Sequence, residues 1–218
     1  MLLSVVLLPL ISALVVLLFG RFFNKISIIM IALTILVVCI INIAIVFFDL
    51  ICQNNIARII LIPAFANIGF SINYVLQCDY LAIILLIVVL MISFLVHVYS
   101  IVYMADDPHF NRFIGYLSFF TFFMLLLVAA NDLFLLFIGW EGVGLCSFLL
   151  ISFWFTRTQA NISALKAFFI NRIGDSFFLI GLVLLICLCK NVNNQLIFEL
   201  NKQSLCVLKL FIITKHSP

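Results

Sequence analysis

The sequence carries very little charge. Only 9% of its 218 residues are Asp, Glu, Lys or Arg, against about 25% in an ordinary soluble domain, whereas 67% are hydrophobic. Eleven basic and eight acidic residues leave a formal net charge of +3, and the basic residues are scattered along the chain. Because proteins that bind nucleic acid cluster their basic residues, we expect no nucleic-acid partner. The same composition excludes intrinsic disorder and places the chain in a membrane.

The sequence also lacks the alternation of apolar and polar residues that is typical of a transmembrane β-barrel. Its apolar runs are uninterrupted and about twenty residues long, which at about 1.5 Å per residue is enough to cross a hydrocarbon core of about 30 Å. The pattern predicts an all-α fold, a polytopic transmembrane helix bundle of about six spans. We place these spans at residues 2–19, 26–48, 80–103, 112–130, 132–154 and 162–189.

The spans divide the chain into four parts. Residues 1–48 hold two N-terminal spans, and residues 80–189 hold the other four. Residues 49–79 mix apolar residues with Asn, Gln and Pro, and we expect a short hairpin or an interfacial segment outside the bilayer. Residues 190–218 form a polar tail without a run long enough for a seventh span. No basic segment or small-residue cleavage site accompanies the first span, so we expect a permanent helix rather than a signal peptide.

The basic residues of the short loops predict how the chain crosses the membrane. Four of them follow spans one, three and five: Arg21, Lys25, Arg112 and Arg157. The opposite side has only Arg58 before the tail. Since basic loops stay on the cytoplasmic or matrix side, we expect the N-terminus and residues 49–79 on the outer side.

The cysteines and histidines do not form a recognisable metal site. Seven cysteines and three histidines show no spacing typical of zinc, iron–sulfur or haem sites. We therefore expect no metal and no cofactor on this chain. Cys52 and Cys78 both lie in the expected outer segment, and the sequence leaves open whether they form a disulfide.

A carboxylate in the middle of the fifth span is the first candidate functional residue. Glu141 lies about ten residues into that span, where a charge costs about 2.5–3.5 kcal/mol on insertion scales. It is therefore expected to face protein or water. The glycines around it let a neighbouring backbone or water approach: Gly139, Gly142 and Gly144. No cation stands at helical spacing from Glu141 on its own helix, so a proton site explains this residue better than a structural ion pair.

The sixth span adds three charged residues. Arg172 and Asp175 are three residues apart, so they are neighbours on one helix face, and we expect them to pair within the membrane. Such a pair is either a device that holds helices together or part of a proton relay, because moving a cation changes the affinity of a buried carboxyl group for protons. Lys166 lies near the expected helix start, where its side chain can reach the interface.

Three motifs in these spans carry a resemblance. The segments GWEGVGLCSFLL, FWFTRTQAN and NRIGD, within a stretch from Val96 to Gly181, resemble the chain 5 family of NADH:ubiquinone oxidoreductase, respiratory complex I. The resemblance implies an antiporter-like membrane subunit related to the cation/proton antiporters and built from inverted repeats with broken helices. It implies that Glu141 is the proton-site carboxylate, working against a lysine on a seventh helix. It also implies that Arg172 and Asp175 couple charge to the adjacent antiporter-like subunit.

The resemblance implies a function and a location as well. The chain is expected to be the N-terminal part of a proton-translocating subunit of the NADH:ubiquinone reductase, with no redox chemistry of its own. NADH, FMN, iron–sulfur clusters and ubiquinone are expected on other subunits. The expected partners are the other membrane-arm subunits and membrane lipids. The expected location is the mitochondrial inner membrane, with a mitochondrial gene, since a chain rich in Phe, Ile and Asn fits an AT-rich organellar genome.

The length of the family leaves alternatives open. Family members are far longer, and the seventh-helix lysine and the second repeat have no counterpart in this sequence. We expect either a second chain that supplies them, as from a split gene, or a truncated product. Two other functions also stay open, a structural scaffold of the distal membrane arm and a subunit of a sodium/proton antiporter.

Overall fold

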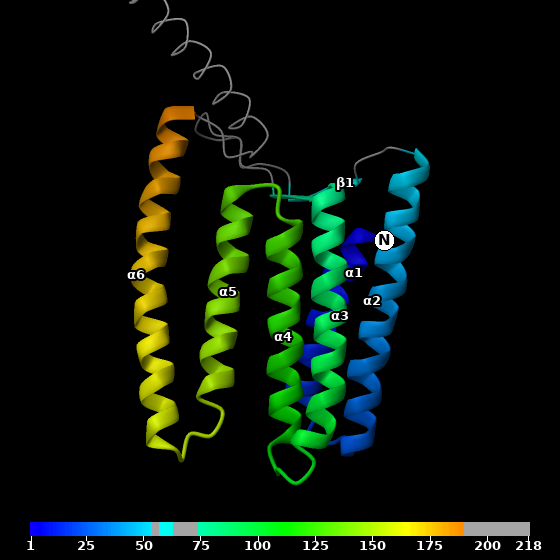
Figure 1. Cartoon of the computed structure of the whole chain (residues 1–218), viewed down its shortest axis with the longest axis vertical. Helices are drawn as coiled ribbons and strands as arrows, with labels where there is room; N and C mark the ends of the chain where they lie inside the picture. Colours follow the sequence, from blue (N-terminus) through cyan, green and yellow to red (C-terminus); the bar gives the residue numbers. More distant parts are fainter. Residues whose placement is uncertain (54–56, 63–73, 190–218) are drawn as a thin grey trace, which may run out of the picture.

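The computed structural model describes residues 1–53, 57–62 and 74–189, which form a bundle of long helices aligned along one direction (Figure 1). The helices are α1 (Leu2–Phe19), α2 (Lys25–Gln53), α3 (Tyr80–Tyr103), α4 (Phe110–Ala129), α5 (Leu133–Ile151) and α6 (Thr158–Cys189). Each of the six is long and apolar enough to cross a membrane. The predicted all-α polytopic bundle is therefore confirmed.

Helix α4 lies at the centre of the packing. It contacts α1, α3 and α5, and its buried residues recur at the three- and four-residue spacing of a helix face, as in Ile114, Ser118 and Leu125. The main core lies among α1, α2, α3 and α4, where Leu36, Leu86 and Leu125 are at most 2% exposed.

Helix α6 is different, because it packs principally against α5. Only 11% of the most apolar 18-residue stretch of α6 is buried, against 50% of the corresponding stretch of α4. Most of the surface of α6 is therefore left for lipid or for another protein.

Two short strands connect α2 to α3. Strand β1 (Ala57–Ile62) pairs antiparallel with β2 (Tyr74–Cys78), one of the two structures that the sequence left open. Helix α2 continues beyond residue 48 to Gln53, because Leu50 is buried in the core at 2% exposure. The hairpin lies against the α4–α5 connection, since the backbone of Leu76 bridges to that of Ala130.

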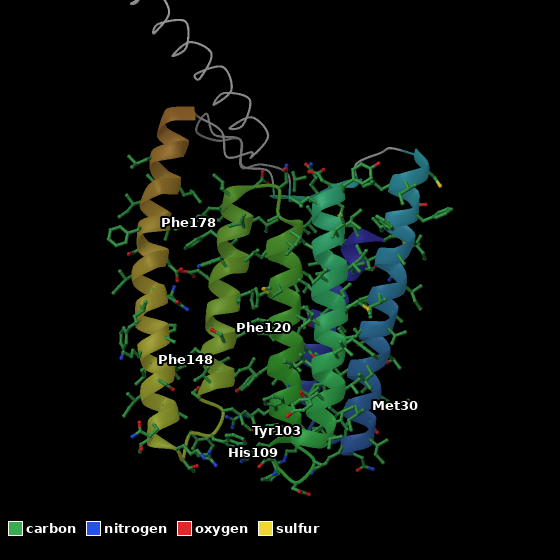
Figure 2. The ribbon with its side chains drawn as sticks, in the orientation of Figure 1. Met30, Tyr103, His109, Phe120, Phe148 and Phe178 are labelled. Atoms are coloured by element: carbon green, nitrogen blue, oxygen red, sulfur yellow. The ribbon has the colours of Figure 1, made fainter. Side chains whose placement is uncertain are left out.

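The α1–α2 and α3–α4 loops meet at the other end of the bundle. Lys25 Nζ, at the start of α2, donates a hydrogen bond of 2.7 Å to the Ala105 carbonyl of the α3–α4 loop. Asn111 Nδ2, in the first turn of α4, donates one of 2.6 Å to the Gly20 carbonyl after α1. Figure 2 labels Tyr103 and His109 at this same end. The side of the membrane on which these loops lie stays a prediction, and residues 190–218 lie outside the described residues.

The two cysteines of the expected outer segment are free thiols. Cys52 is exposed at the end of α2, and Cys78 is buried in β2. The disulfide considered from the sequence is therefore not formed. Burial, with the Asp79 carboxylate as a second cause, raises the pKa of the Cys78 thiol to about 12, which leaves it unreactive at neutral pH.

Candidate functional site between α5 and α6

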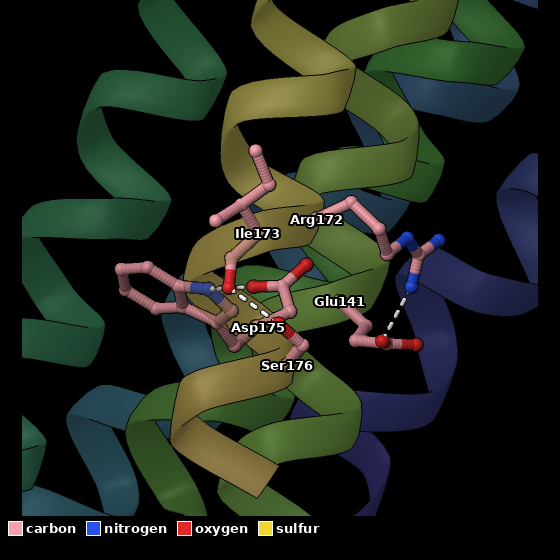
Figure 3. A network of polar contacts seen from close by, with 6 residues as sticks. Glu141, Arg172, Ile173, Asp175 and Ser176 are labelled. Carbon is pink, nitrogen blue, oxygen red and sulfur yellow. Dashed lines mark hydrogen bonds and ion pairs between the residues drawn. The ribbon is translucent and has the colours of Figure 1, made fainter.

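The charged residues of α5 and α6 meet in an ion pair between the two helices (Figure 3). Arg172 Nη1 donates a hydrogen bond of 2.5 Å to Glu141 Oε1. The pair is partly open to the surroundings, since the Arg172 side chain is 46% exposed and that of Glu141 is 34% exposed. The Arg172 guanidinium also lies 5.1 Å from the centre of the Phe168 ring, a distance suited to a cation–π contact. Arg172 is thus held by an anion and by an aromatic face.

The expected pairing of Arg172 with Asp175 is wrong in this structure. Arg172 reaches across to Glu141 on α5, whereas the carboxylate of Asp175 accepts a hydrogen bond of 2.9 Å from Trp140 Nε1. Asp175 is also buried, at 7% exposure, whereas the Arg172 side chain is partly exposed. The two side chains therefore have different neighbours, although they are three residues apart on one helix.

Two consecutive residues of α5 thus hold two residues of α6. Trp140 contacts Asp175 through its indole N–H, and Glu141 contacts Arg172 through its carboxylate. All three predicted site residues lie in this cluster, and Trp140 is a further member that the sequence analysis did not single out. Its indole N–H is a donor that needs a partner inside a membrane, and that requirement is the signal that could have found it.

The glycines beside Glu141 bring α5 close to α4 rather than to α6. A Cβ atom on Gly139 would lie 2.8 Å from the Leu127 Cα atom, and one on Gly142 would lie 2.1 Å from the Phe123 ring. Apart from the nearby backbone of α5 itself, no described residue lies within 4 Å of the corresponding position on Gly144. Gly139 and Gly142 therefore let α4 approach the Glu141 segment, as expected of glycines there, while Gly144 leaves open space.

Lys166 lies deeper along α6 than expected. The helix begins at Thr158, so Lys166 is about 12 Å further along its axis, at about 1.5 Å per residue. Its side chain is exposed. Among the described residues it has no ion-pair partner. Lys166 is thus a second cation on the outer surface of α6.

Asp132 is a buried carboxylate that sequence analysis missed. It precedes α5 and is 0% exposed, and its Oδ2 accepts a hydrogen bond of 3.0 Å from the Val75 N–H of β2. Its Oδ1 is buried and has no hydrogen-bond partner among the residues that the structure describes. Burial raises the pKa of Asp132, and the Val75 N–H opposes that shift. An aspartate directly before an apolar helix is a capping signal, but here its side chain holds the hairpin instead.

His97 is a buried polar residue within α3, at 1% exposure. Its Nδ1 donates a hydrogen bond of 2.8 Å to the Ser93 carbonyl, so Nε2 is left to accept one of 3.2 Å from Ser118 Oγ on α4. Both ring nitrogens are therefore satisfied by the packing of α3 against α4. Within the described part of the chain, no three His, Cys, Asp or Glu side chains gather as a metal site would need.

The fold and this site together define a polytopic membrane subunit with charged residues paired inside its spans. Comparison with known families extends this description. Residues 65–114 match the family model for the N-terminus of chain 5 of NADH-ubiquinone oxidoreductase (complex I). Residues 130–214 match the transmembrane family model shared by NADH:quinone oxidoreductases and Mrp antiporters. The second match includes Glu141, Arg172 and Asp175.

Individual relatives agree with the family models. The chain is 44% identical over 204 residues to NADH-ubiquinone oxidoreductase chain 5 of Hypocrea jecorina, a match over 92% of this chain and 29% of the relative. It is 43% identical over 205 residues to a probable intron-encoded endonuclease 4 of Neurospora crassa, over 92% of this chain and 37% of that protein. The chain thus spans about a third of the length of these relatives.

The fold has a counterpart among solved structures. A chain of the membrane-bound sulfane sulfur reductase, an archaeal respiratory membrane complex, superposes with a TM-score of 0.74 at 19% identity. The superposition covers 88% of this chain and 39% of that chain. The chain belongs to the family of complex I chain 5 and the Mrp-type antiporter subunits, and it corresponds to an N-terminal part of chain 5.

Proposed function

We propose that the chain translocates protons as part of a complex I membrane arm, with Glu141 as the group that takes up and releases the proton. The observation that carries this proposal is the Glu141–Arg172 ion pair in the middle of two spans. A charged pair there is costly in lipid and is typical of ion and proton pathways. Its partial exposure fits a group that exchanges protons with water in the assembled protein.

The proposed mechanism uses the cation as a switch. While the Arg172 guanidinium lies against Glu141, the carboxylate is stabilised in its ionised form. Arg172 stays protonated throughout, so it acts by its position and not by giving up a proton. Its withdrawal leaves Glu141 as an isolated carboxylate in an apolar environment, which then takes a proton from water. Its return stabilises the carboxylate again and releases that proton.

Asp175 offers the alternative position for the guanidinium. It lies one turn of α6 from Arg172, within the reach of an arginine side chain. In the resting arrangement Trp140 donates to Asp175, so the carboxylate is already engaged. Moving Arg172 to Asp175 therefore competes with this hydrogen bond, and Trp140 sets how easily the switch occurs.

We further propose that this chain serves an NADH-oxidising complex whose redox centres lie on other subunits. The supporting observation is the name of the Hypocrea relative, NADH-ubiquinone oxidoreductase chain 5. The exposed surface of α6, with Lys166 and the open side of the ion pair, favours cover by another membrane subunit or by a second chain with the remaining helices. The proposed location is the mitochondrial inner membrane.

A sodium/proton antiporter subunit is the second candidate. The match to a family model that names Mrp antiporters favours it. The same ion pair suits either function, because a carboxylate can take up and release protons both in NADH-driven pumping and in sodium/proton exchange. NADH-driven proton movement without sodium separates the first function from the second.

The experiment replaces Glu141 in the complex that contains this chain. Glu141→Gln should leave the complex assembled on native gels and lower NADH-driven proton uptake by vesicles. Glu141→Asp keeps a titratable group one methylene shorter and should retain part of the uptake, since a water can bridge the gap. Asp49→Asn, at an exposed position of α2, is the matched control and should behave as wild type. If the Glu141→Gln variant pumps like wild type, Glu141 has a structural role and the chain acts as a scaffold.

A further inference from the structure

We propose that a cationic cavity at the loop end of α1 and α4 binds the phosphate group of an anionic phospholipid. The cavity has a volume of about 360 Å³. That size lies within the roughly 300–1,000 Å³ typical of small-molecule sites. Its walls come from the end of α1, the α3–α4 loop and the first turn of α4. The polar wall is formed by Arg21, His109, Asn111 and Arg112, and the apolar wall includes Val16 and Leu17.

The two arginines of this cavity have no anionic partner in the described part of the chain. Among the described residues, no carboxylate lies within ion-pair distance of Arg21 or Arg112. Two aspartates of the adjacent α3–α4 loop, Asp106 and Asp107, form no ion pair with them. Both guanidinium groups are therefore available to an anion from outside the chain. A guanidinium matches the oxygens of a phosphate with two parallel hydrogen bonds, so this pair favours a phosphate ligand.

Neighbouring residues hold Arg112 and Asn111 of the cavity in place. The Arg112 guanidinium lies between 5.8 and 6.0 Å from three ring centres, those of Tyr116, Phe153 and Phe155. Asn111 is fixed by its hydrogen bond to the Gly20 carbonyl. Arg112 is thus positioned beside three aromatic rings, which accept no ordinary hydrogen bond from it. This part of the site is therefore formed before any ligand arrives.

Aromatic residues place this end of the bundle at the level of the lipid head groups. Tyr99 and Tyr103 stack with ring centres 5.7 Å apart, and Trp154 lies 6.3 Å from Tyr103. Tyrosine and tryptophan gather at membrane–water interfaces, and Figure 2 shows Tyr103 and His109 at the same end. Phe22, next to Arg21, is 83% exposed and offers an apolar contact to an acyl chain. A phosphate carried by a lipid therefore fits the position better than a free phosphate ion.

The test measures lipid binding by the full 218-residue chain in a neutral detergent. Dioleoylphosphatidylglycerol and dioleoylphosphatidylcholine are titrated separately, and native mass spectrometry counts the bound lipids. Wild type should bind the anionic lipid more tightly. Each basic residue near an anionic membrane surface contributes about 1 kcal/mol, so each of Arg21→Gln and Arg112→Gln should weaken phosphatidylglycerol binding about fivefold. Phosphatidylcholine binding should change little.

Matched variants decide between this site and a general effect of charge. Arg157→Gln removes the same charge at the same end, but that guanidinium lies 5.0 Å from the Trp154 ring and outside the cavity, so the variant should bind as wild type. Replacing both arginines by lysine keeps the charge but removes the two parallel hydrogen bonds of each guanidinium, so it should keep only part of the preference. Equal weakening by Arg157→Gln, or no weakening by either cavity variant, overturns the proposal.

Two measurements on the wild type keep the test independent of variant folding. Raising the salt concentration should reduce the preference for phosphatidylglycerol, because salt screens exposed charges. A preference that is independent of salt contradicts the proposal. Millimolar inorganic phosphate should not displace the lipid. If inorganic phosphate binds and phosphatidylglycerol does not, the site takes free phosphate and the assignment to a lipid is wrong.

Discussion

Removing Arg172 tests the pairing between α5 and α6 most sharply. Arg172→Leu leaves Glu141 as a carboxylate without a cation inside a span. Breaking a fully buried pair from one side costs about 3–5 kcal/mol, whereas an exposed pair contributes about 0–1 kcal/mol. Glu141 is 34% exposed, so we expect a loss of about 1–2 kcal/mol in the free energy of unfolding. For a chain of this size that loss lowers Tm by about 2–8 °C.

A second substitution shows which carboxylate depends on Arg172. Adding Glu141→Gln to Arg172→Leu should restore most of the lost Tm, because it removes the charge that was left alone. Adding Asp175→Asn should not, because Asp175 is bound by Trp140 and not by Arg172. Thermal unfolding of the purified full chain in one detergent measures all four proteins. If Asp175→Asn restores the Tm of the Arg172→Leu protein and Glu141→Gln does not, the pairing of Arg172 with Glu141 is refuted.

Two other predictions concern Trp140 and Asp132. Trp140→Phe keeps an aromatic ring but removes the hydrogen-bond donor to Asp175. We expect the free energy of unfolding to fall by about 1 kcal/mol. A Tm equal to that of wild type would contradict this expectation. Burial raises the pKa of Asp132 in the folded protein above its value in the unfolded chain. The stability that Asp132 contributes is therefore fully present below the unfolded-state pKa, and it is lost as the pH rises through the folded-state pKa. Hydrogen exchange of the hairpin, corrected for intrinsic rates, should therefore show better protection in mild acid than at neutral pH. Asp132→Asn should remove this difference, and a variant with the wild-type pH dependence would exclude Asp132 as its source.

The six helices could be predicted from the sequence because a bilayer imposes their length. Lipid offers no hydrogen bonds to the backbone, so each span must be a helix of about twenty apolar residues. Helix ends were less predictable, as at Gln53, because they depend on packing against the rest of the bundle. The charged residues Glu141, Arg172 and Asp175 could be singled out as candidate site residues for the same physical reason, since charge is rare in such spans.

The contacts among those residues could not be predicted in the same way. Spacing along one helix indicates that Arg172 and Asp175 are neighbours, but it does not indicate which face of α6 meets α5. That orientation places Asp175 against Trp140 and turns Arg172 toward Glu141. Asp132 was missed for a similar reason, because its partner lies on a strand 57 residues earlier in the chain.

The central claim is that Glu141 changes between its ionised and protonated forms while the complex works. Difference infrared spectroscopy of the reconstituted complex, with and without NADH, records the carbonyl stretching band of protonated carboxylic acids. We expect a band that forms during NADH oxidation in wild type, persists at a shifted frequency in Glu141→Asp, and is missing in Glu141→Gln at a matched rate of NADH oxidation. Identical difference bands in wild type and Glu141→Gln would contradict the claim that Glu141 carries the proton.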